Sequence, residues 1–414
     1  MIDLNKKYWF YIYPSVYVSS QKNKMLLYNT KDGMYLETDS EINIQLIKDV
    51  YDSRNLGVVT LDSRYILEVT CLSFIDNIIK KGLGNLEEVN EGEKPVNLLP
   101  ILNLQRDIDR LIKHGISLES EDFLKYLTEI NIFINNSCAV KCIHCVSYSK
   151  QTYSCFSNKN NNTNLHPEIV DNILLQASNS LTRRINILGG NILLYTQWNN
   201  LFAIFEKYDY DFHYWIHYLN LMKSENWLKN TVYLKKEILI TFPLDEDIIK
   251  NTFIYFKNDN NTHFHFLIEN ESQFNETENY IQLFNLHQVV IIPIFTGKNS
   301  LFFRKNIFLE KEDILKGITQ RRIFCNQKLN SNHFGKIYCF PDGSVKANMN
   351  SIEIGNVSKD QLLQIVLNEM EGNTAWRKIR NEIPCSICLY QYLCPSPSNY
   401  ELVIGKPNFC HVKA

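Results

Sequence analysis

The chain has 414 residues, enough for two or three domains with separate cores. Hydrophobic residues make up 45% and charged residues 21%, and the formal net charge is only -2, which excludes a strongly charged binder of nucleic acid or anionic membranes. No apolar run approaches the roughly 18 to 20 residues that cross a bilayer, and the start lacks a signal-peptide core. We therefore expect a cytoplasmic protein whose eleven cysteines include metal ligands rather than disulfides.

Residues 1–95 predict a small α+β domain. Aromatic and β-branched residues indicate strands at Tyr8–Tyr13 and Tyr17–Val18, and Asn29–Gly33 has hairpin-turn composition between Met25–Tyr28 and Met34–Glu37. Two helices follow. The first, capped by Asp39 and Ser40, carries Ile42, Leu46, Ile47 and Val50, and the second, Leu67 to Lys81, carries Leu72, Ile75, Ile78 and Ile79 and ends at Gly82.

Residues 96–128 form a linker in the predicted organisation. Two prolines, Pro95 and Pro100, stiffen its beginning because proline fixes φ and restricts the residue before it. A short helix follows, with an apolar side made of Leu104, Ile108, Leu111 and Ile112.

Residues 129–318 alternate regularly between strand and helix patterns. The strands are Ile130–Ile134, Arg184–Leu188, Phe212–His217, Ile238–Phe242, His263–Ile268 and Val289–Phe295. The helices are Pro167–Ser180, Trp198–Lys207, Leu221–Leu228, Asp247–Phe256 and Phe274–Leu286. This alternation predicts an α/β fold with a parallel sheet, wound by right-handed crossovers into an open partial barrel whose ligands bind at the carboxyl ends of the strands.

Three cysteines follow the first of these strands directly. Cys138, Cys142 and Cys145 are separated by three and then two residues, so they can curl round one inorganic centre. A four-iron cluster on three thiolates keeps one iron open, whereas a structural zinc needs a fourth donor such as His144 or Cys155. Zinc and iron-sulfur both remain open from spacing alone.

This strand and cysteine loop closely resemble the radical SAM superfamily. The resemblance implies a 4Fe-4S cluster whose open iron chelates S-adenosyl-L-methionine and cleaves it to a 5'-deoxyadenosyl radical. The second strand ends in Gly189-Gly190-Asn191, where the family usually has Gly-Gly-Glu that receives the methionyl ammonium. Asn191 offers a neutral acceptor, which makes a weaker bond to an ammonium. Thr241, Glu269 and His217 end later strands and are further candidates for contacting cofactor or substrate.

Residues 319–414 contain six more cysteines: Cys325, Cys339, Cys385, Cys388, Cys394 and Cys410. The last four, with Cys385 and Cys388 at metal-ligand spacing, can hold zinc or a fully liganded four-iron cluster. With Phe340–Lys346 and Gly355-Asn356-Val357, this part resembles the SPASM domain of radical SAM peptide maturases. The resemblance makes Cys385, Cys388, Cys394 and Cys410 the ligands of one auxiliary 4Fe-4S cluster.

The second auxiliary site of SPASM domains is incomplete in this sequence. Cys325 matches its first ligand, but Asn348 and Ser398 stand where two other cysteines are expected, and Cys339 is additional. We therefore predict a single auxiliary cluster.

The whole chain looks most like the pseudo-radical-SAM/SPASM proteins of ribosomal-peptide modification systems. The resemblance implies a winged-helix-like amino-terminal domain that binds the leader of a precursor peptide, and a second radical SAM maturase as partner. One hypothesis is a radical SAM peptide-modifying enzyme. Another is a non-catalytic partner that presents peptide to the other maturase. A structural zinc protein and an amino-terminal domain without a ligand are the remaining alternatives.

Overall fold

The computed structural model describes residues 6–66, 69–90, 92–100, 102, 107–115, 122–140, 142, 145–156, 163–221, 231, 233–256 and 258–413. His144, Leu104, Leu67 and most of the helix predicted at 221–228 lie outside these residues. Among the described residues, no helix is both long enough and apolar enough to cross a membrane.

The amino-terminal part consists of two three-stranded antiparallel sheets and two main helices. One sheet has the order β5-β1-β6 and the other β2-β3-β4. The elements are β1 (Lys7–Ile12), β2 (Val16–Gln21), β3 (Lys24–Asn29), β4 (Tyr35–Thr38), α1 (Glu41–Tyr51), η1 (Ser53–Asn55), β5 (Val58–Asp62), α2 (Ser63–Ile66), α3 (Val69–Lys80) and β6 (Gly84–Glu88). The predicted strands and helices are therefore present.

One turn and one helix of this part can be compared directly with the sequence predictions. Asn29–Gly33 connects β3 to β4 as the sequence predicts, and Gly33 adopts a φ of +76°, which favours glycine. Ser40 stands at the start of α1, but its side chain makes no capping hydrogen bond, and Ile42 is exposed rather than part of the apolar face. The buried side of α1 is instead built on Ile44, Leu46, Ile47 and Val50.

The linker packs against this part at Asn97. The backbone N–H of Asn97 donates to the carbonyl of Leu56 at 2.9 Å, and its side chain donates to the carbonyl of Ile12 at 2.7 Å. Gly57 permits this contact, because a Cβ there would lie 2.1 Å from the Asn97 carbonyl oxygen. The short helix α4 (Asp107–Lys113) and η2 (Phe123–Tyr126) follow.

A nine-stranded sheet forms the largest part of the molecule, with the order β12-β11-β10-β9-β8-β7-β13-β14-β15. Strands β7 (Glu129–Phe133), β8 (Arg184–Leu188), β9 (Asp211–His217), β10 (Lys235–Thr241), β11 (Thr262–Ile268) and β12 (Val289–Pro293) are parallel neighbours in chain order. This confirms the predicted parallel sheet. The connecting helices are α5 (Cys145–Ser149), α6 (Pro167–Ala177), η3 (Ile192–Leu194), α7 (Trp198–Phe205), α8 (Tyr218–Leu221), α10 (Glu246–Phe256) and α11 (Glu271–Phe284).

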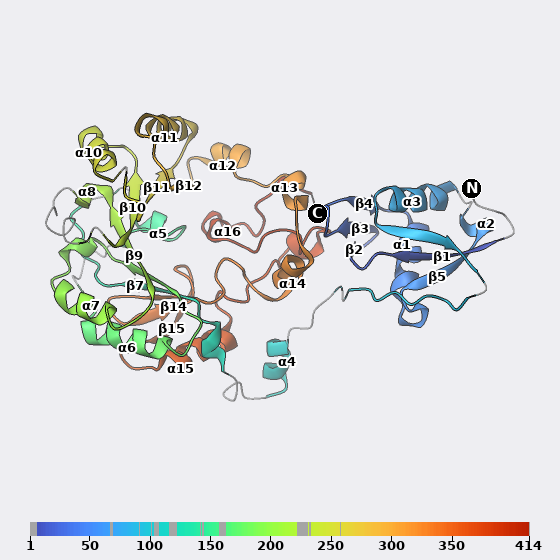
Figure 1. Cartoon of the computed structure of the whole chain (residues 1–414), viewed down its shortest axis with the longest axis horizontal. Helices are drawn as coiled ribbons and strands as arrows, with labels where there is room; N and C mark the ends of the chain where they lie inside the picture. Colours follow the sequence, from blue (N-terminus) through green and yellow to red (C-terminus); the bar gives the residue numbers. More distant parts are fainter. Residues whose placement is uncertain are drawn as a thin grey trace.

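The carboxyl-terminal part extends this sheet. Strand β13 (Lys336–Cys339) pairs parallel with β7, and β14 (Ser344–Lys346) and β15 (Glu353–Asn356) continue antiparallel. The other elements are α12 (Ser300–Asn306), α13 (Lys311–Leu315), α14 (Gln320–Lys328), α15 (Leu362–Gly372), η4 (Cys385–Ile387) and α16 (Asn399–Ile404). Figure 1 shows helices α6, α7, α10 and α11 along the outer side of the sheet, and α13 and the carboxyl terminus beside β4.

The two faces of the parallel sheet differ in chemistry. The helix-covered face is aliphatic and aromatic and includes Ile130, Ile132, Ile185, Ile187 and Ile238. On the inner face, one layer is apolar and contains Phe133, Leu188, Trp215, Leu239, Tyr338 and Phe340. Nearer the amino ends of the strands, the inner face carries buried polar groups, among them Asn131, Asn186, His213 and Glu237.

Tyr28 joins the amino-terminal part to the carboxyl-terminal part, and its removal tests that junction. Its buried hydroxyl donates to the Leu315 carbonyl at 2.8 Å and accepts from the Ile318 N–H at 2.9 Å. We expect Tyr28→Phe to lower the free energy of unfolding by about 1–3 kcal/mol, because both backbone groups lose their partner. The denaturant midpoint measures this. Tyr255→Phe, at a side chain that is 50% exposed, is the control and should change stability by less than about 0.5 kcal/mol. Equal midpoints for the two variants would contradict the prediction.

Candidate functional site

The cysteine loop leaves the sheet at the carboxyl end of β7 and is held there by the end of β8. Asn135 donates from Nδ2 to the Asn191 carbonyl at 2.8 Å and accepts the Gly190 N–H at 3.1 Å. The Asn191 N–H donates to the Ser137 carbonyl at 2.6 Å. These bonds fix the start of the loop one residue before Cys138.

Gly189 and Gly190 are required by this close approach of two chain segments. A Cβ on Gly189 would lie 2.3 Å from Asn135 Oδ1, and one on Gly190 would lie 2.4 Å from the Ser137 carbonyl oxygen. Any larger residue would push the loop away from the strand end. The glycines thus serve the packing of the cysteine loop itself.

Asn191, which stands at the predicted ammonium-binding position, is buried and locally engaged. Its Oδ1 accepts the Leu193 N–H at 3.1 Å, which caps η3. The oxygen that would receive a ligand therefore already satisfies a backbone donor.

The structure brings Cys138, Cys142 and Cys145 into one group, together with Cys155. Burial raises the pKa of Cys142 to about 11, with further contributions from the neighbouring Cys145 and Cys138 thiols. Burial also raises the pKa of Cys138. A hydrogen bond with Cys145 and then burial raise the pKa of Cys155, and the Cys145 thiol donates to the Cys155 carbonyl at 3.3 Å. Such thiols stay protonated until a metal displaces the protons.

His217 stands at the end of β9 against the cysteine group. Its Nε2 lies 2.9 Å from Thr241 Oγ1 and 3.8 Å from Cys142 Sγ, and its Nδ1 accepts the Leu219 N–H at 3.3 Å. Accepting at Nδ1 places the ring proton on Nε2, facing the sulfur. Burial lowers the pKa of His217 to about 4, so the ring is neutral at physiological pH. His217 can therefore donate a hydrogen bond to a Cys142 thiolate.

A cavity of about 730 Å³ opens beside Cys142 at the carboxyl ends of β10 and β11. Thr241 and Glu269, both predicted site residues, line it together with Tyr148. The Tyr148 hydroxyl donates to Glu269 Oε1, and burial followed by this contact raises the pKa of Tyr148. The cavity joins a sulfur group to hydroxyl and carboxylate groups, a mixture that suits a polar, zwitterionic ligand.

The four carboxyl-terminal cysteines form a second sulfur group. Cys385 and Cys394 are buried, and burial, followed by neighbouring thiols of the group that include Cys410, raises the pKa of Cys385, Cys388 and Cys394. Burial raises the pKa of Cys394 to about 12, against the lowering effect of Arg380.

Arg380 supplies a buried positive charge to this second group. Its Nη1 lies 3.8 Å from Cys385 Sγ, and its Nη2 pairs with Glu401 Oε1 at 2.6 Å, with both side chains 5% exposed. Burial alone would lower the pKa of Arg380, but Cys394 and Glu401 raise it above its ordinary value. The guanidinium therefore offsets the negative charge that metal-bound thiolates carry.

Asn348 and Ser398, which the sequence resemblance places where cysteines are expected, are hydrogen-bonded within the protein. Asn348 donates from Nδ2 to the His333 ring at 3.0 Å and to Asn399 Oδ1 at 2.7 Å. Ser398 caps α16 through a capping box with Glu401. Cys339 is fully buried and its pKa is raised to about 12 by burial. The Asn348 amide and the Ser398 hydroxyl therefore already have hydrogen-bond partners within the protein.

Two contributors to these sites, Tyr148 and Arg380, were not predicted from the sequence. Both lie near cysteines in the sequence, but nothing in the spacing marks their roles. His217, a candidate because it ends a strand, lies against Cys142. The grouping of Cys155 with Cys145 depends on the fold of residues between them, although Cys155 had been considered as a fourth donor.

Comparisons with known proteins give backbone likenesses only. No family model and no curated protein matches the chain. Streptococcus suis SuiB bound to S-adenosylmethionine and the same protein bound to precursor peptide SuiA are each 14% identical, with a TM-score of 0.41 over 98% of this chain and 99% of theirs. Native anSMEcpe with bound AdoMet and Kp18Cys peptide is 13% identical, with a TM-score of 0.45 over 68% of this chain and 95% of its own.

His333 gives a pH test of the hydrogen-bonded group that it forms with Asn348. Burial, followed by the nearby Lys336, lowers its pKa to about 4, whereas an unfolded histidine titrates near 6.5. The unfolded chain therefore binds more protons, and the free energy of unfolding should fall between about pH 6.5 and pH 4, by up to about 3 kcal/mol from this residue.

The measurement is denaturant unfolding as a function of pH. His333→Gln should flatten the loss of stability on acidification, while His114→Gln, at an exposed histidine, should leave the slope unchanged. An identical slope in both variants would show that His333 is not held neutral by the fold.

Proposed function

We propose that this protein is a radical SAM/SPASM-type protein that takes part in the post-translational modification of a ribosomally made peptide. Its architecture would be a partial (β/α)6 barrel preceded by a winged-helix-like domain and followed by a SPASM-like extension, with boundaries near residues 95, 128 and 318. The observation that carries the proposal is the gathering of Cys138, Cys142 and Cys145 beside the 730 Å³ cavity at the carboxyl edge of the parallel sheet. Ligands bind at that edge in such sheets.

The cysteine loop has the properties that a three-cysteine 4Fe-4S cluster needs. Thiolates are the usual ligands of iron-sulfur clusters. When bound, such a cluster supplies the electron that cleaves S-adenosyl-L-methionine. His217 would donate a hydrogen bond to Cys142, and hydrogen bonds to cluster sulfurs tune the reduction potential.

The cavity beside Cys142 offers groups for S-adenosyl-L-methionine. Glu269 and the Thr241 hydroxyl line it and suit the polar groups of the cofactor, with Tyr148 orienting Glu269. Gly189, Gly190 and Asn191 would act through the cysteine loop that they hold in place. The descriptions of the similar structures reported above name the same cofactor.

A single auxiliary 4Fe-4S cluster would occupy Cys385, Cys388, Cys394 and Cys410. Its four thiolates would saturate the irons, so its role would be electron transfer or substrate seating rather than S-adenosyl-L-methionine binding. Buried Arg380 supports this assignment, because a cluster with four thiolates is negatively charged.

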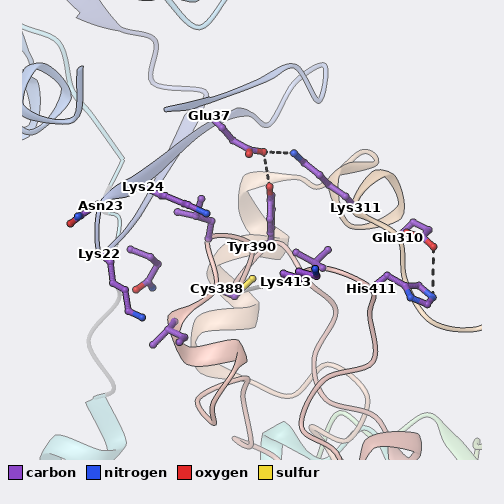
Figure 2. A pocket seen from close by; sticks show the side chains of 14 residues that line it. Lys22, Asn23, Lys24, Glu37, Glu310, Lys311, Cys388, Tyr390, His411 and Lys413 are labelled. Atoms are coloured by element: carbon purple, nitrogen blue, oxygen red, sulfur yellow. Dashed lines mark hydrogen bonds and ion pairs between the residues drawn. The ribbon is translucent and has the colours of Figure 1, made fainter. Parts of the chain in front are cut away.

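A peptide has a candidate docking place between the amino-terminal part and this second sulfur group. A hollow of about 530 Å³ is lined by the β2–β3 turn and by the segment around Cys388. Figure 2 shows its lining side chains. Lys22, Lys24 and Lys413 give it a basic character that suits an acidic peptide segment. Strand β4 lies at the edge of its sheet, which is the place where an extended peptide adds by main-chain hydrogen bonds.

Iron content and S-adenosyl-L-methionine cleavage test the assignment together. Anaerobically reconstituted protein should contain about eight irons and form 5'-deoxyadenosine with a reductant. Cys142→Ala should lose about four irons and all cleavage, and Cys394→Ala should lose about four irons. Cys325→Ala is the matched control and should keep the wild-type iron content. Zinc-loaded, colourless protein without cleavage would overturn the proposal.

A second candidate function is supported by the place of Cys155. Its thiol lies against Cys145 in the same group, so four cysteines surround the first centre. If all four bound the cluster, no iron would be open, and the protein would be a non-catalytic partner that binds peptide and assists a separate radical SAM maturase.

Cys155→Ala separates the two functions. For an enzyme with an open iron, the variant should keep about eight irons and the wild-type rate of 5'-deoxyadenosine formation. For a closed four-thiolate centre, wild-type protein should be inactive, and the variant should gain cleavage or S-adenosyl-L-methionine binding. The rate of cleavage and the spectral change of the reduced cluster on cofactor addition are the readouts.

A further inference from the structure

A separate group of metal-binding side chains lies on the inner face of the sheet, at the amino ends of β9, β10 and β11. Within the described part of the chain, His213, Glu237 and His263 are the set of histidines, cysteines and carboxylates whose ligand atoms all lie within 4.8 Å of one another. They lie at the opposite end of the strands from His217 and Thr241. We propose that these three residues bind a divalent transition metal ion, such as Zn²⁺.

The strands hold the three side chains on one rigid surface. Glu237 is in register with His263 on β11 and with Trp215 on β9, two residues beyond His213. Side chains two residues apart on a strand share a face, so His213 and Glu237 point to the same interior. Sites on strands are held more firmly than sites on loops.

One distance around the Glu237 carboxylate is close to that between two ligands of one ion, and the other is shorter. Its Oε1 lies 2.6 Å from His213 Nδ1, and its Oε2 lies 3.2 Å from His263 Nδ1. Two ligands bound tetrahedrally to zinc at 2.0–2.1 Å are about 3.3 Å apart. A bound ion therefore requires only small movements. His265 Nε2 lies 2.6 Å from Glu237 Oε2, so His265 can act as a further ligand or as a hydrogen-bond donor to the Glu237 carboxylate.

Acidic groups on both sides of His213 favour a positive charge at this place. Asp211 Oδ2 lies 3.1 Å from His213 Nε2, and Glu237 Oε1 lies 2.6 Å from Nδ1. A neutral imidazole has one ring proton, so it cannot donate to both carboxylates. A cation bound at Nδ1, with the ring proton on Nε2 towards Asp211, satisfies both sides of the ring.

Arg184 is the competitor for this carboxylate. Its Nη2 lies 3.1 Å from Glu237 Oε1, and its side chain is 38% exposed, so it can turn towards solvent when an ion binds. His263, with its side chain 33% exposed, provides access from outside to the otherwise buried group. Removing the arginine should therefore strengthen ion binding.

The ligand types separate this site from the two cysteine groups. Imidazole and carboxylate suit zinc and similar divalent ions, whereas thiolates suit iron-sulfur clusters. An ion here would connect three neighbouring strands beneath the apolar layer formed by Trp215 and Leu239. Its presence does not depend on the proposed radical chemistry.

Cobalt binding to the full-length protein tests the site. Protein with its cysteine groups already loaded with iron is titrated with Co²⁺, and visible absorption and calorimetry give the stoichiometry. Glu237→Gln and His263→Gln should each bind one Co²⁺ fewer than wild type, or bind it at least tenfold more weakly. His287→Gln, at an exposed histidine, should match wild type, and Arg184→Gln should bind Co²⁺ more tightly.

Two results would overturn the proposal. One is equal Co²⁺ binding by Glu237→Gln and His287→Gln. The other is wild-type protein that binds no Co²⁺ outside its cysteine groups, which would mean that a proton bridges Glu237 and His213. Unchanged iron content and circular dichroism establish that the variants fold. If Glu237→Gln does not fold, magnetic resonance of Co²⁺ in wild-type protein with ¹⁵N-labelled histidine decides, because absent nitrogen coupling excludes the site.

Discussion

The contact between the Asn135–Ser137 backbone and the Gly189-Gly190 pair fixes the place of the first sulfur group. These two chain segments can approach so closely only because neither glycine has a Cβ. The hydrogen bonds of Asn135 to Gly190 and Asn191 then hold the loop over the carboxyl edge of the sheet. Cys142, four residues after Cys138, lies beside His217 and lines the cavity. The chemistry proposed for this edge therefore depends on the two glycines at the end of the neighbouring strand β8.

The inner face of the sheet divides into layers of different polarity. An apolar layer with Phe133, Trp215 and Leu239 separates the cysteine edge from the buried polar groups around Glu237. Buried charge is costly unless it is paired and hydrogen-bonded, and Glu237 meets this condition through Arg184 and three histidines. Such a complete set of partners indicates that the polar layer is a built feature of the fold.

Much of the fold could be predicted from the sequence because its signals are local. Alternating strand and helix patterns between residues 129 and 318 gave the parallel sheet, and Asn29–Gly33 gave the hairpin turn. The pairing of β13 with β7 could not be predicted, since it joins segments some 200 residues apart and no local pattern records it. The contact of Arg380 with Cys385 joins residues only five apart, but no sequence pattern marks it. The grouping of His213, Glu237 and His263 depends on the register between three strands, which the sequence does not record. The spacing of the cysteines suggested their groups, whereas the engagement of Asn191 Oδ1 by Leu193 needed the structure.

Strand β4 is attached to the carboxyl-terminal segment by a small charged cluster. Glu37 accepts a hydrogen bond from the hydroxyl of Tyr390, which lies two residues after Cys388, at 2.6 Å. Glu37 also pairs with Lys311 at 2.6 Å (Figure 2). If the proposed metal centre orders the loop around Cys388, it would also fix Tyr390 and the strand edge to which Glu37 belongs. By thermodynamic reciprocity, a peptide that preferred the ordered edge would then raise the affinity of the four cysteines for their metal by the same factor. Under the proposed function, this small cluster would therefore couple peptide binding to metal binding.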